Sequence, residues 1–409
     1  MWLTPNKRCF DYAQHDVFYI KLISNEYFMR IIFLCGGLEP GRDGVGDYTR
    51  RLAGKLLEQG HEVAAVALAD SNTEQQLAET QHLDGSSISV LRLPHTWPLQ
   101  KRSAVAREWI DQFDPEWISL QFVCFSFHPK GLNFDLGGHL NLICQGRKLH
   151  VMVHELWVGE DTKSFSKEQV LGWLQKATIR LLFKTLAFDA VSTSNSFYQT
   201  CLAKIGVDAG QINIFSNLPV GHKPRTGLYD QLPGKVRRNR DQYLIASFFG
   251  TSDYRNPDLT IANLKFLAAS TDKTLLVTHV GRATGVSNFF LKLSELLNLE
   301  THIFGECNDQ DIADYFCSTD VGLSTYPKIV FEKSGSIAAM LNNGLPVLLL
   351  RDSFVTDERK IDWVEEAHRI GNLDQFMSQK NTFSDNYGVS QAAEKYIRVF
   401  ESSRSMRIV

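Results

Sequence analysis

A glycine-rich segment at 36–47 holds the first residues whose types and spacing could do chemistry. It lies between a strand predicted at 30–35 and a helix predicted to begin near Asp47. Free N–H groups and the positive end of the helix dipole therefore meet there and favour a phosphate or carboxylate. We expect Gly44 and Gly46 to contact a substrate phosphate or an acceptor, with a purely structural turn as the alternative. Asp47 either caps the helix or bonds an acceptor hydroxyl.

A second candidate anion site precedes an apolar helix predicted at 337–341. Its turn residues are Ser334, Gly335 and Ser336. Serine can cap the helix, while glycine exposes backbone N–H groups at the positive helix end. Lys333 adds a cation beside them. A diphosphate fits this arrangement, whereas a plain helix cap with a solvated lysine is the alternative.

Two ionisable residues, His154 and Glu155, follow a short apolar run at 150–153. They fall where a buried strand is expected to end, which is the edge of a parallel sheet where ligands bind. A lone histidine at such a position is commonly structural, and Glu155 is the competing candidate for a catalytic base.

The elements that must position these residues alternate between strands and helices, as in a doubly wound α/β domain covering 29–217. The predicted strands are 30–35, 62–68, 87–93, 117–123, 150–153 and 190–193, and the predicted helices after the first are 104–113, 136–144, 167–188 and 196–205. The dinucleotide fingerprint is absent, because Gly44-Val-Gly46 continues as Asp-Tyr-Thr. A simple NAD-binding domain is therefore not expected.

A second α/β domain is predicted at 218–390, after an exposed connection rich in proline, glycine and basic residues at 219–241. Its predicted strands are 243–249, 274–280, 301–304, 321–325 and 346–350. Two such domains facing across a cleft would place a ligand between them.

The two chain ends are expected to lie outside these domains. Residues 1–28 are either an extension upstream of a natural start at Met29 or an extra strand or helix, and they lack the apolar core of a signal peptide. Residues 391–409 are predicted to form a final helix, centred on 392–400, and a frayed tail.

Composition excludes several function classes. The 409 residues carry a net charge of −3, which gives no reason to propose a nucleic-acid partner. The seven cysteines show no Cys-x-x-Cys pair, so neither a zinc site nor a disulfide framework is predicted and a reducing, cytoplasmic location fits. The Asp309-Gln-Asp311 pair precedes a helix predicted at 312–316, which favours capping over metal binding. No metal site is predicted.

Four segments resemble the GT-B glycosyltransferases, which use nucleotide-sugar donors, and most closely those of the retaining family 4 type. They are residues 56–63, the strand end around His154, the turn at 214–217 and residues 304–347. The resemblance covers about residues 29–351. It implies two Rossmann-like domains, the first for the acceptor and the second for the donor.

The resemblance also implies roles for individual residues. His154 would face the donor sugar, Glu332 would replace a family glutamate shifted by one position, and Lys333 with the 334–336 turn would hold the donor phosphates. The positions of the two usual glutamates contain Phe331 and Ala339, and those of the usual arginine and lysine contain Thr251 and Asn256. The candidate replacements for those two cations are Arg255 and Arg282.

The function implied is transfer of a sugar from a nucleotide-diphosphate-sugar donor to a hydroxyl of a glycan or lipid-linked acceptor, with retention, in surface-glycan or glycolipid synthesis. No metal or other cofactor is expected. The alternatives are a non-catalytic nucleotide-sugar-binding or partner protein, and another GT-B chemistry such as sugar-nucleotide epimerisation. The helix predicted at 170–188 carries Lys176, Arg180 and Lys184, so a core-facing helix is favoured over peripheral contact with the inner face of the membrane.

Overall fold

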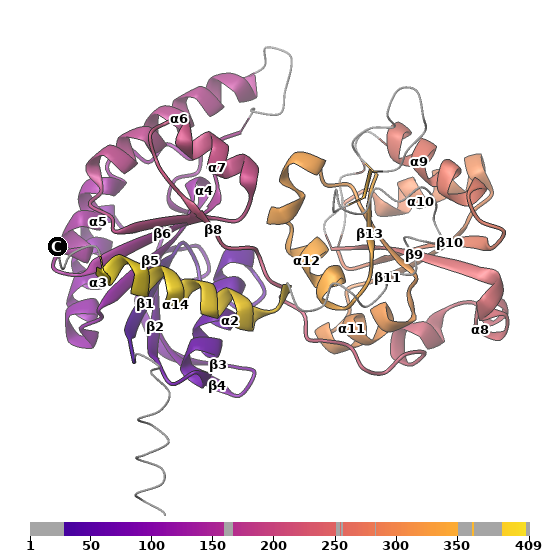
Figure 1. Ribbon diagram of the computed structural model, residues 1–409, viewed down its shortest axis with the longest axis horizontal. Coiled ribbons are helices and arrows are strands. Elements are labelled where there is room, and N and C mark those ends of the chain that lie inside the picture. The colour runs from indigo at the N-terminus through magenta and orange to yellow at the C-terminus, as the bar shows by residue number, and fades with distance from the viewer. Residues whose placement is uncertain are drawn as a thin grey trace, which may run out of the picture.

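Two α/β halves make up the described part of the chain in the computed structural model (Figure 1). The structure describes residues 28–158, 167–250, 254, 257–282, 284–350, 362–363 and 387–405. Each half contains one sheet that is parallel except at an edge strand. The predicted extension at 1–28 lies outside the described residues, except for Phe28.

The first sheet has eight strands in the order β3-β4-β2-β1-β5-β6-β7-β8. Their bounds are β1 Arg30–Cys35, β2 Glu62–Asp70, β3 Leu77–Leu83, β4 Ser86–Pro94, β5 Trp117–Val123, β6 Lys148–Glu155, β7 Ala190–Thr193 and β8 Gly210–Gln211. The predicted strands are confirmed, but β3 and β8 were not predicted. The edge strand β3 is mostly polar, and β8 has only two residues, so neither produces an apolar run.

Helices bury both faces of this sheet. They are α2 Gly44–Glu58, α3 Leu99–Phe113, α4 Cys124–Phe127, α5 Leu136–Cys144, α6 Lys167–Thr185 and α7 Ser196–Ala203. Alternate residues of β1 enter different cores: Ile32 and Leu34 pack in one cluster, and Ile31 and Phe33 in the other. A strand with both faces buried explains the continuous apolar run at 30–35.

The helix α2 begins at Gly44, so the predicted start near Asp47 is wrong by one turn. Asp43 is the N-cap, and its carboxylate accepts hydrogen bonds from Val45 N at 2.8 Å and Gly46 N at 3.1 Å. Gly44 and Gly46 therefore belong to the first helical turn rather than to the loop. The sequence predicted a loop at these glycines, because glycine is unfavourable within a helix.

The second sheet has six strands in the order β11-β10-β9-β12-β13-β14. The strands are β9 Tyr243–Phe249, β10 Thr274–Val280, β11 Glu300–Gly305, β12 Val321–Ser324, β13 Val347–Leu349 and β14 Asp362–Trp363. Its α-helices are α8 Gly234–Arg238, α9 Asp258–Ala269, α10 Val286–Leu297, α11 Asp309–Ser318 and α12 Gly335–Asn342, and its 3₁₀ helices are η1 Gly227–Gln231, η2 Arg240–Gln242 and η3 Lys328–Lys333.

The segment at 219–241, expected to be an exposed connection, instead packs into the core of the second half. Leu228, Tyr229, Leu232 and Val236 are all buried there. The many basic residues of this segment favoured an exposed connection in the sequence. The buried apolar residues are spaced too irregularly to indicate a helix.

The last helix, α14 Val389–Ser405, lies along the first half, as the yellow ribbon in Figure 1 shows. The expected helix at 392–400 is confirmed and is longer than predicted. Tyr396 and Phe400 are fully buried, and Phe400 stacks on Trp117 with ring centroids 4.5 Å apart. The chain end thus closes one face of the first sheet.

The helix α6 faces the core with Ile179, Leu182 and Phe183, which are buried, so the favoured core-facing arrangement is confirmed. Its outer side also carries apolar residues, since Trp173 is 69% exposed. Among the described residues, no helix is long and apolar enough to cross a bilayer.

Replacement of Gly46 by alanine should destabilise the fold, because the added Cβ would lie 2.5 Å from the carbonyl oxygen of Gly37. We expect a loss of about 1–3 kcal/mol, typical of overpacking against rigid backbone. Gly44→Ala is the matched control, since nothing lies within 4 Å of its added Cβ. Urea unfolding of both variants measures the difference, and equal stabilities would contradict this packing.

Candidate functional site

Two cavities lie between the halves and share Asn217, Tyr326 and Gly335. The first, which we call the His154 cavity, has a volume of about 300 Å³, and its other lining residues include Asp43, Gly44, Tyr48, Ser126, His154, Glu155 and Lys333. The second, which we call the Arg50 cavity, has a volume of about 480 Å³ and is lined also by Asp47, Arg50, Arg51, Asp309, Ser334, Ser336 and Ala339. Both cavities therefore reach the start of α12.

His154 lies at the end of β6 and is 7% exposed. Its Nε2 donates to the Oε1 of Gln121 at 2.8 Å, which leaves Nδ1 as an acceptor. Burial lowers the pKa of His154 to about 3, so the ring is neutral at physiological pH. Such a ring can accept a hydrogen bond from a ligand hydroxyl, but it is a poor proton acceptor near pH 7.

A buried hydrogen-bond network holds this histidine. Gln121 Oε1 also accepts from the hydroxyl of Tyr396 on α14 at 3.1 Å, and its Nε2 donates to Ser119 at 2.8 Å. The ring of Tyr48 packs edge-on against His154 with centroids 4.9 Å apart. The imidazole is thus fixed by residues from several separate segments.

The start of α12 matches the turn predicted from the sequence. The Ser334 hydroxyl accepts from Ile337 N at 3.3 Å, which confirms the predicted serine cap. Nothing lies within 4 Å of a Cβ built on Gly335, which lines both cavities. Ser336 lies against Gly250, whose added Cβ would be 2.6 Å from the serine hydroxyl oxygen.

Lys333 reaches across the interface into the first half. Its Nζ lies 3.2 Å from Glu155 Oε1 and donates to the hydroxyl of Tyr198 at 3.1 Å. Burial lowers the pKa of Lys333, but Tyr198 and Glu155 outweigh that effect and raise the pKa above its ordinary value. The lysine is therefore a cation whose present counter-ion is Glu155.

Of the other predicted residues of the second half, Glu332 and Arg282 line neither cavity. The carboxylate of Glu332 accepts from Ser196 N and Gln211 Nε2, each at 3.3 Å, on the first half. Arg282 is 70% exposed and forms an ion pair with Glu306. Arg255 lies outside the described residues.

Asp47 lines the Arg50 cavity but does not cap α2, so that alternative is wrong. It accepts from Gly41 N at 3.0 Å and forms an ion pair with Arg50. Arg50 is a buried cation in the same cavity that the sequence analysis missed. Asp47 and Arg50 are three residues apart on a helix, so they lie on the same side of it. That spacing was the sequence signal from which the pair could have been predicted.

Arg51 and Asp309 form an ion pair between the halves, 3.4 Å from Nη2 to Oδ2. Asn308 accepts from Asp311 N at 2.8 Å and is the N-cap of α11, so the predicted capping by the aspartates is wrong. Asp309 instead lines the Arg50 cavity, where it pairs with Arg51. Among the described residues, no cluster of His, Cys, Asp and Glu has a metal-binding arrangement.

Neither a protein-family model nor a curated protein sequence matches the chain. Solved structures do. HepE from Anabaena in complex with UDP is 15% identical, with a TM-score of 0.55 over 91% of this chain and 100% of that chain. A glycosyltransferase from Rickettsia africae is 13% identical, with a TM-score of 0.54 over 94% and 100%.

A third similar structure is a protein assigned as a UDP-N-acetylglucosamine 2-epimerase from Listeria monocytogenes. It is 12% identical, with a TM-score of 0.51 over 93% of this chain and 98% of that chain. The two sheets and these neighbours show that the chain has the GT-B fold, with two Rossmann-like domains.

Stability should depend on pH through His154, whose pKa falls from 6.5 to about 3 on folding. The unfolded chain binds the proton more readily, so the free energy of unfolding should fall as the pH decreases from 6.5 toward 3. One such histidine contributes a slope of up to about 1.4 kcal/mol per pH unit. Denaturant unfolding of His154→Gln should show a shallower pH dependence than the original chain. Identical slopes would contradict the neutral, buried imidazole.

Proposed function

We propose that this chain is a glycosyltransferase that moves a sugar from a nucleotide-diphosphate-sugar donor to a hydroxyl acceptor. The observation that carries the proposal is the His154 cavity, where the open helix start at Gly335 and the strand-end His154 line one space from opposite domains. The first supplies N–H groups for an anion, and the second supplies an acceptor for a hydroxyl.

In this proposal the donor diphosphate lies at the start of α12. Backbone N–H groups beside Ser334, Gly335 and Ser336 and the charge of Lys333 would stabilise the departing diphosphate. Arg50 adds a buried cation on the facing helix. Gly44 lines the His154 cavity from the first half, and its missing side chain leaves room for the donor. Asp47 and Arg255 stay candidates for acceptor and donor contacts, respectively.

His154 would orient the donor sugar through its Nδ1 rather than remove a proton, because its pKa of about 3 makes it a weak base. Retention of configuration, membership of the family 4 type and a role in surface-glycan or glycolipid synthesis rest on the sequence resemblance. The exposed Trp173, on the helix α6 that also carries Arg180, supports a peripheral membrane contact for a lipid-linked acceptor.

A non-catalytic nucleotide-sugar-binding protein is the second candidate. Ala339, which stands at the place of a usual family glutamate, lines the Arg50 cavity and offers no hydrogen bond to a ribose. The epimerase likeness makes sugar-nucleotide epimerisation a further alternative of the same fold. Turnover assays with an acceptor mixture and without any acceptor separate the three candidates. A glycosyltransferase turns the donor over with an acceptor, an epimerase does so without one, and a binding protein does so in neither assay.

A thermal-shift screen against UDP, GDP, ADP, TDP and CMP tests the donor site. One nucleoside diphosphate should stabilise the protein, and Gly335→Val should weaken its binding at least tenfold by filling the open space at the helix start. Gly138→Val is the matched control, because that helical glycine is also open but lies on α5 outside both cavities. Equal nucleoside diphosphate binding by both variants would contradict a phosphate site at the start of α12.

Replacement of His154 by alanine should lower kcat by about tenfold or more while the melting transition persists, because the donor sugar loses a positioning contact. His154→Gln, which keeps a polar group, should retain more activity than alanine. His82→Ala is the control for a histidine exposed on β3, away from both cavities. Unchanged kcat in His154→Ala would show that this residue serves only packing.

A further inference from the structure

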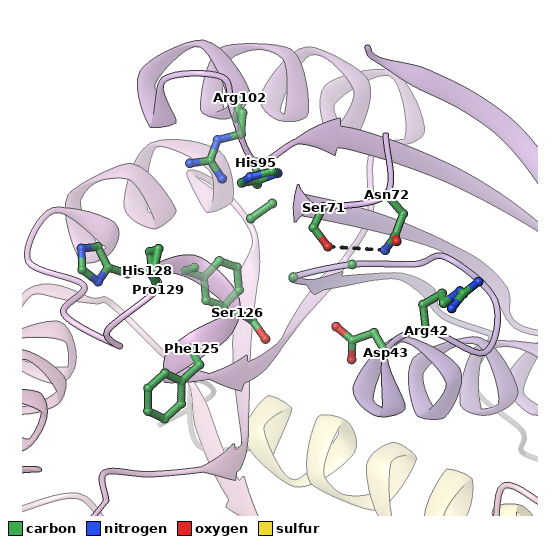
Figure 2. A pocket seen from close by; sticks show the side chains of 14 residues that line it. Arg42, Asp43, Ser71, Asn72, His95, Arg102, Phe125, Ser126, His128 and Pro129 are labelled. Atoms are coloured by element: carbon green, nitrogen blue, oxygen red, sulfur yellow. Dashed lines mark hydrogen bonds between the residues drawn. The ribbon is translucent and has the colours of Figure 1, made fainter. Parts of the chain in front are cut away.

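A third cavity, of about 450 Å³, lies wholly within the first half at the carboxyl ends of β1, β2, β4 and β5. Figure 2 shows its lining side chains, which come from the segments after these strands, including α4, and from α3. Among them are Arg42, His95, Arg102 and His128. We call it the Arg102 cavity. Its volume suits a sugar carrying one additional group.

Arg102 supplies a buried positive charge to this cavity. The residue is 7% exposed, and its Nε and Nη1 donate to the carbonyl oxygens of Trp97 at 2.9 Å and Leu68 at 2.6 Å. Both acceptors are neutral, and no carboxylate in the described part of the chain forms an ion pair with Arg102. Burial lowers the pKa of Arg102, because its charge is removed from water without a counter-ion. The Nη2 group keeps hydrogen atoms for a ligand.

The buried carboxylate of Asp70 does not neutralise this charge. Asp70 is fully buried, but it is bound to Arg92 Nε at 2.8 Å and to the backbone N–H groups of Leu38 and Asn72 at 3.0 and 2.8 Å. Its hydrogen bonds to Arg92 and the backbone hold its pKa below the ordinary value despite burial. Arg102 therefore has no carboxylate partner within the part of the chain that the structure describes.

Two histidines also line the cavity. His128 Nδ1 accepts from Lys130 N and Leu132 N, each at 3.1 Å, so the ring proton lies on Nε2. Figure 2 shows this ring directed away from Arg102. His95 is exposed and lies on the same side of the cavity as Arg102. Arg102 and His95 therefore offer an anion a common side of the cavity.

The opposite side of the cavity leads to the proposed reaction centre. Figure 2 shows Ser126, Asp43 and Arg42 away from Arg102 and His95. Asp43 and Ser126 also line the His154 cavity, so the two cavities adjoin. Arg42 is exposed, whereas Arg102 is buried. A molecule whose anionic group lies at Arg102 can therefore direct a hydroxyl toward Asp43 and His154.

We propose that the Arg102 cavity binds an anionic group, a phosphate or a carboxylate, on the sugar acceptor. The inference rests on the proposed function in one respect, namely that the occupant is the acceptor. The chemistry shared by a sugar phosphate and a sugar acid is an anion several bonds from a free hydroxyl. It matches a cavity with the buried Arg102 on one side and a hydroxyl acceptor, Asp43, on the other.

Calorimetric titration without any nucleotide tests the site with four probes: inorganic phosphate, glucose 6-phosphate, glucuronate and glucose. We expect at least one anionic probe to bind, and glucose to bind at least tenfold more weakly than the better of the two charged sugars. Preference for glucose 6-phosphate identifies a phosphate, whereas preference for glucuronate identifies a carboxylate. Failure of all three anions to bind, or equal binding by glucose, overturns the proposal.

Arg102→Gln should weaken binding of the anionic probe at least tenfold, and Arg102→Lys should recover part of the loss. The control is Arg107→Gln on the same helix, whose side chain is 37% exposed and pairs with Asp111. His95→Gln, at an exposed position, is a second variant whose weaker binding supports the site if Arg102→Gln fails to fold. Unchanged affinity in folded Arg102→Gln, or in His95→Gln where Arg102→Gln does not fold, overturns the proposal.

Nucleoside diphosphate binding separates this inference from the proposed function. Arg102→Gln should keep it unchanged, because Arg102 does not line the cavities at α12. If the protein binds the anionic probes but no nucleotide, the anion site is supported and the transferase proposal is contradicted.

Discussion

The side-chain oxygen of Gln121 is the point on which the site and the chain end both depend. It accepts from His154 Nε2 at 2.8 Å and from the Tyr396 hydroxyl at 3.1 Å, deep inside the first half. Removing a partner would leave a buried polar group unpaired, which costs about 1–3 kcal/mol. The bond from His154 fixes the histidine tautomer, and the bond from Tyr396 links α14 to the sheet. Because both end on one oxygen, folding and site geometry are coupled.

Charge is distributed across the cleft in pairs that join the halves. Lys333 pairs with Glu155, and Arg51 pairs with Asp309, beside the His154 and Arg50 cavities, respectively. A diphosphate at the start of α12 would bring its own charge to Lys333 and compete with Glu155. Donor binding in our proposal is therefore linked to the contacts that hold the domains together. Arg102, in contrast, lies within one domain and forms no ion pair with any described residue.

Much of the fold could be predicted because buried parallel strands are apolar without interruption. The predicted bounds of β1, β5, β7, β9 and β10 agree with the structure. Local chemistry also sufficed for the Ser334 cap, since serine before an apolar helix satisfies a free N–H group. The start of α2 was misplaced because glycines such as Gly44 and Gly46 are typical of loops, whereas here Gly46 lets the first helical turn approach the backbone of Gly37 closely.

The sequence by itself determined the alternation of strands and helices, the helix start at Ser334 and the strand end at His154, because these depend on neighbours within one turn or strand. Only the tertiary structure decided which charges meet. It paired Lys333 with Glu155, brought the Glu332 carboxylate against the first half, and left Arg102 without a carboxylate partner among the described residues. The physical reason is that electrostatic partners depend on distance in space, and residues far apart in the chain carry no local signal of that distance.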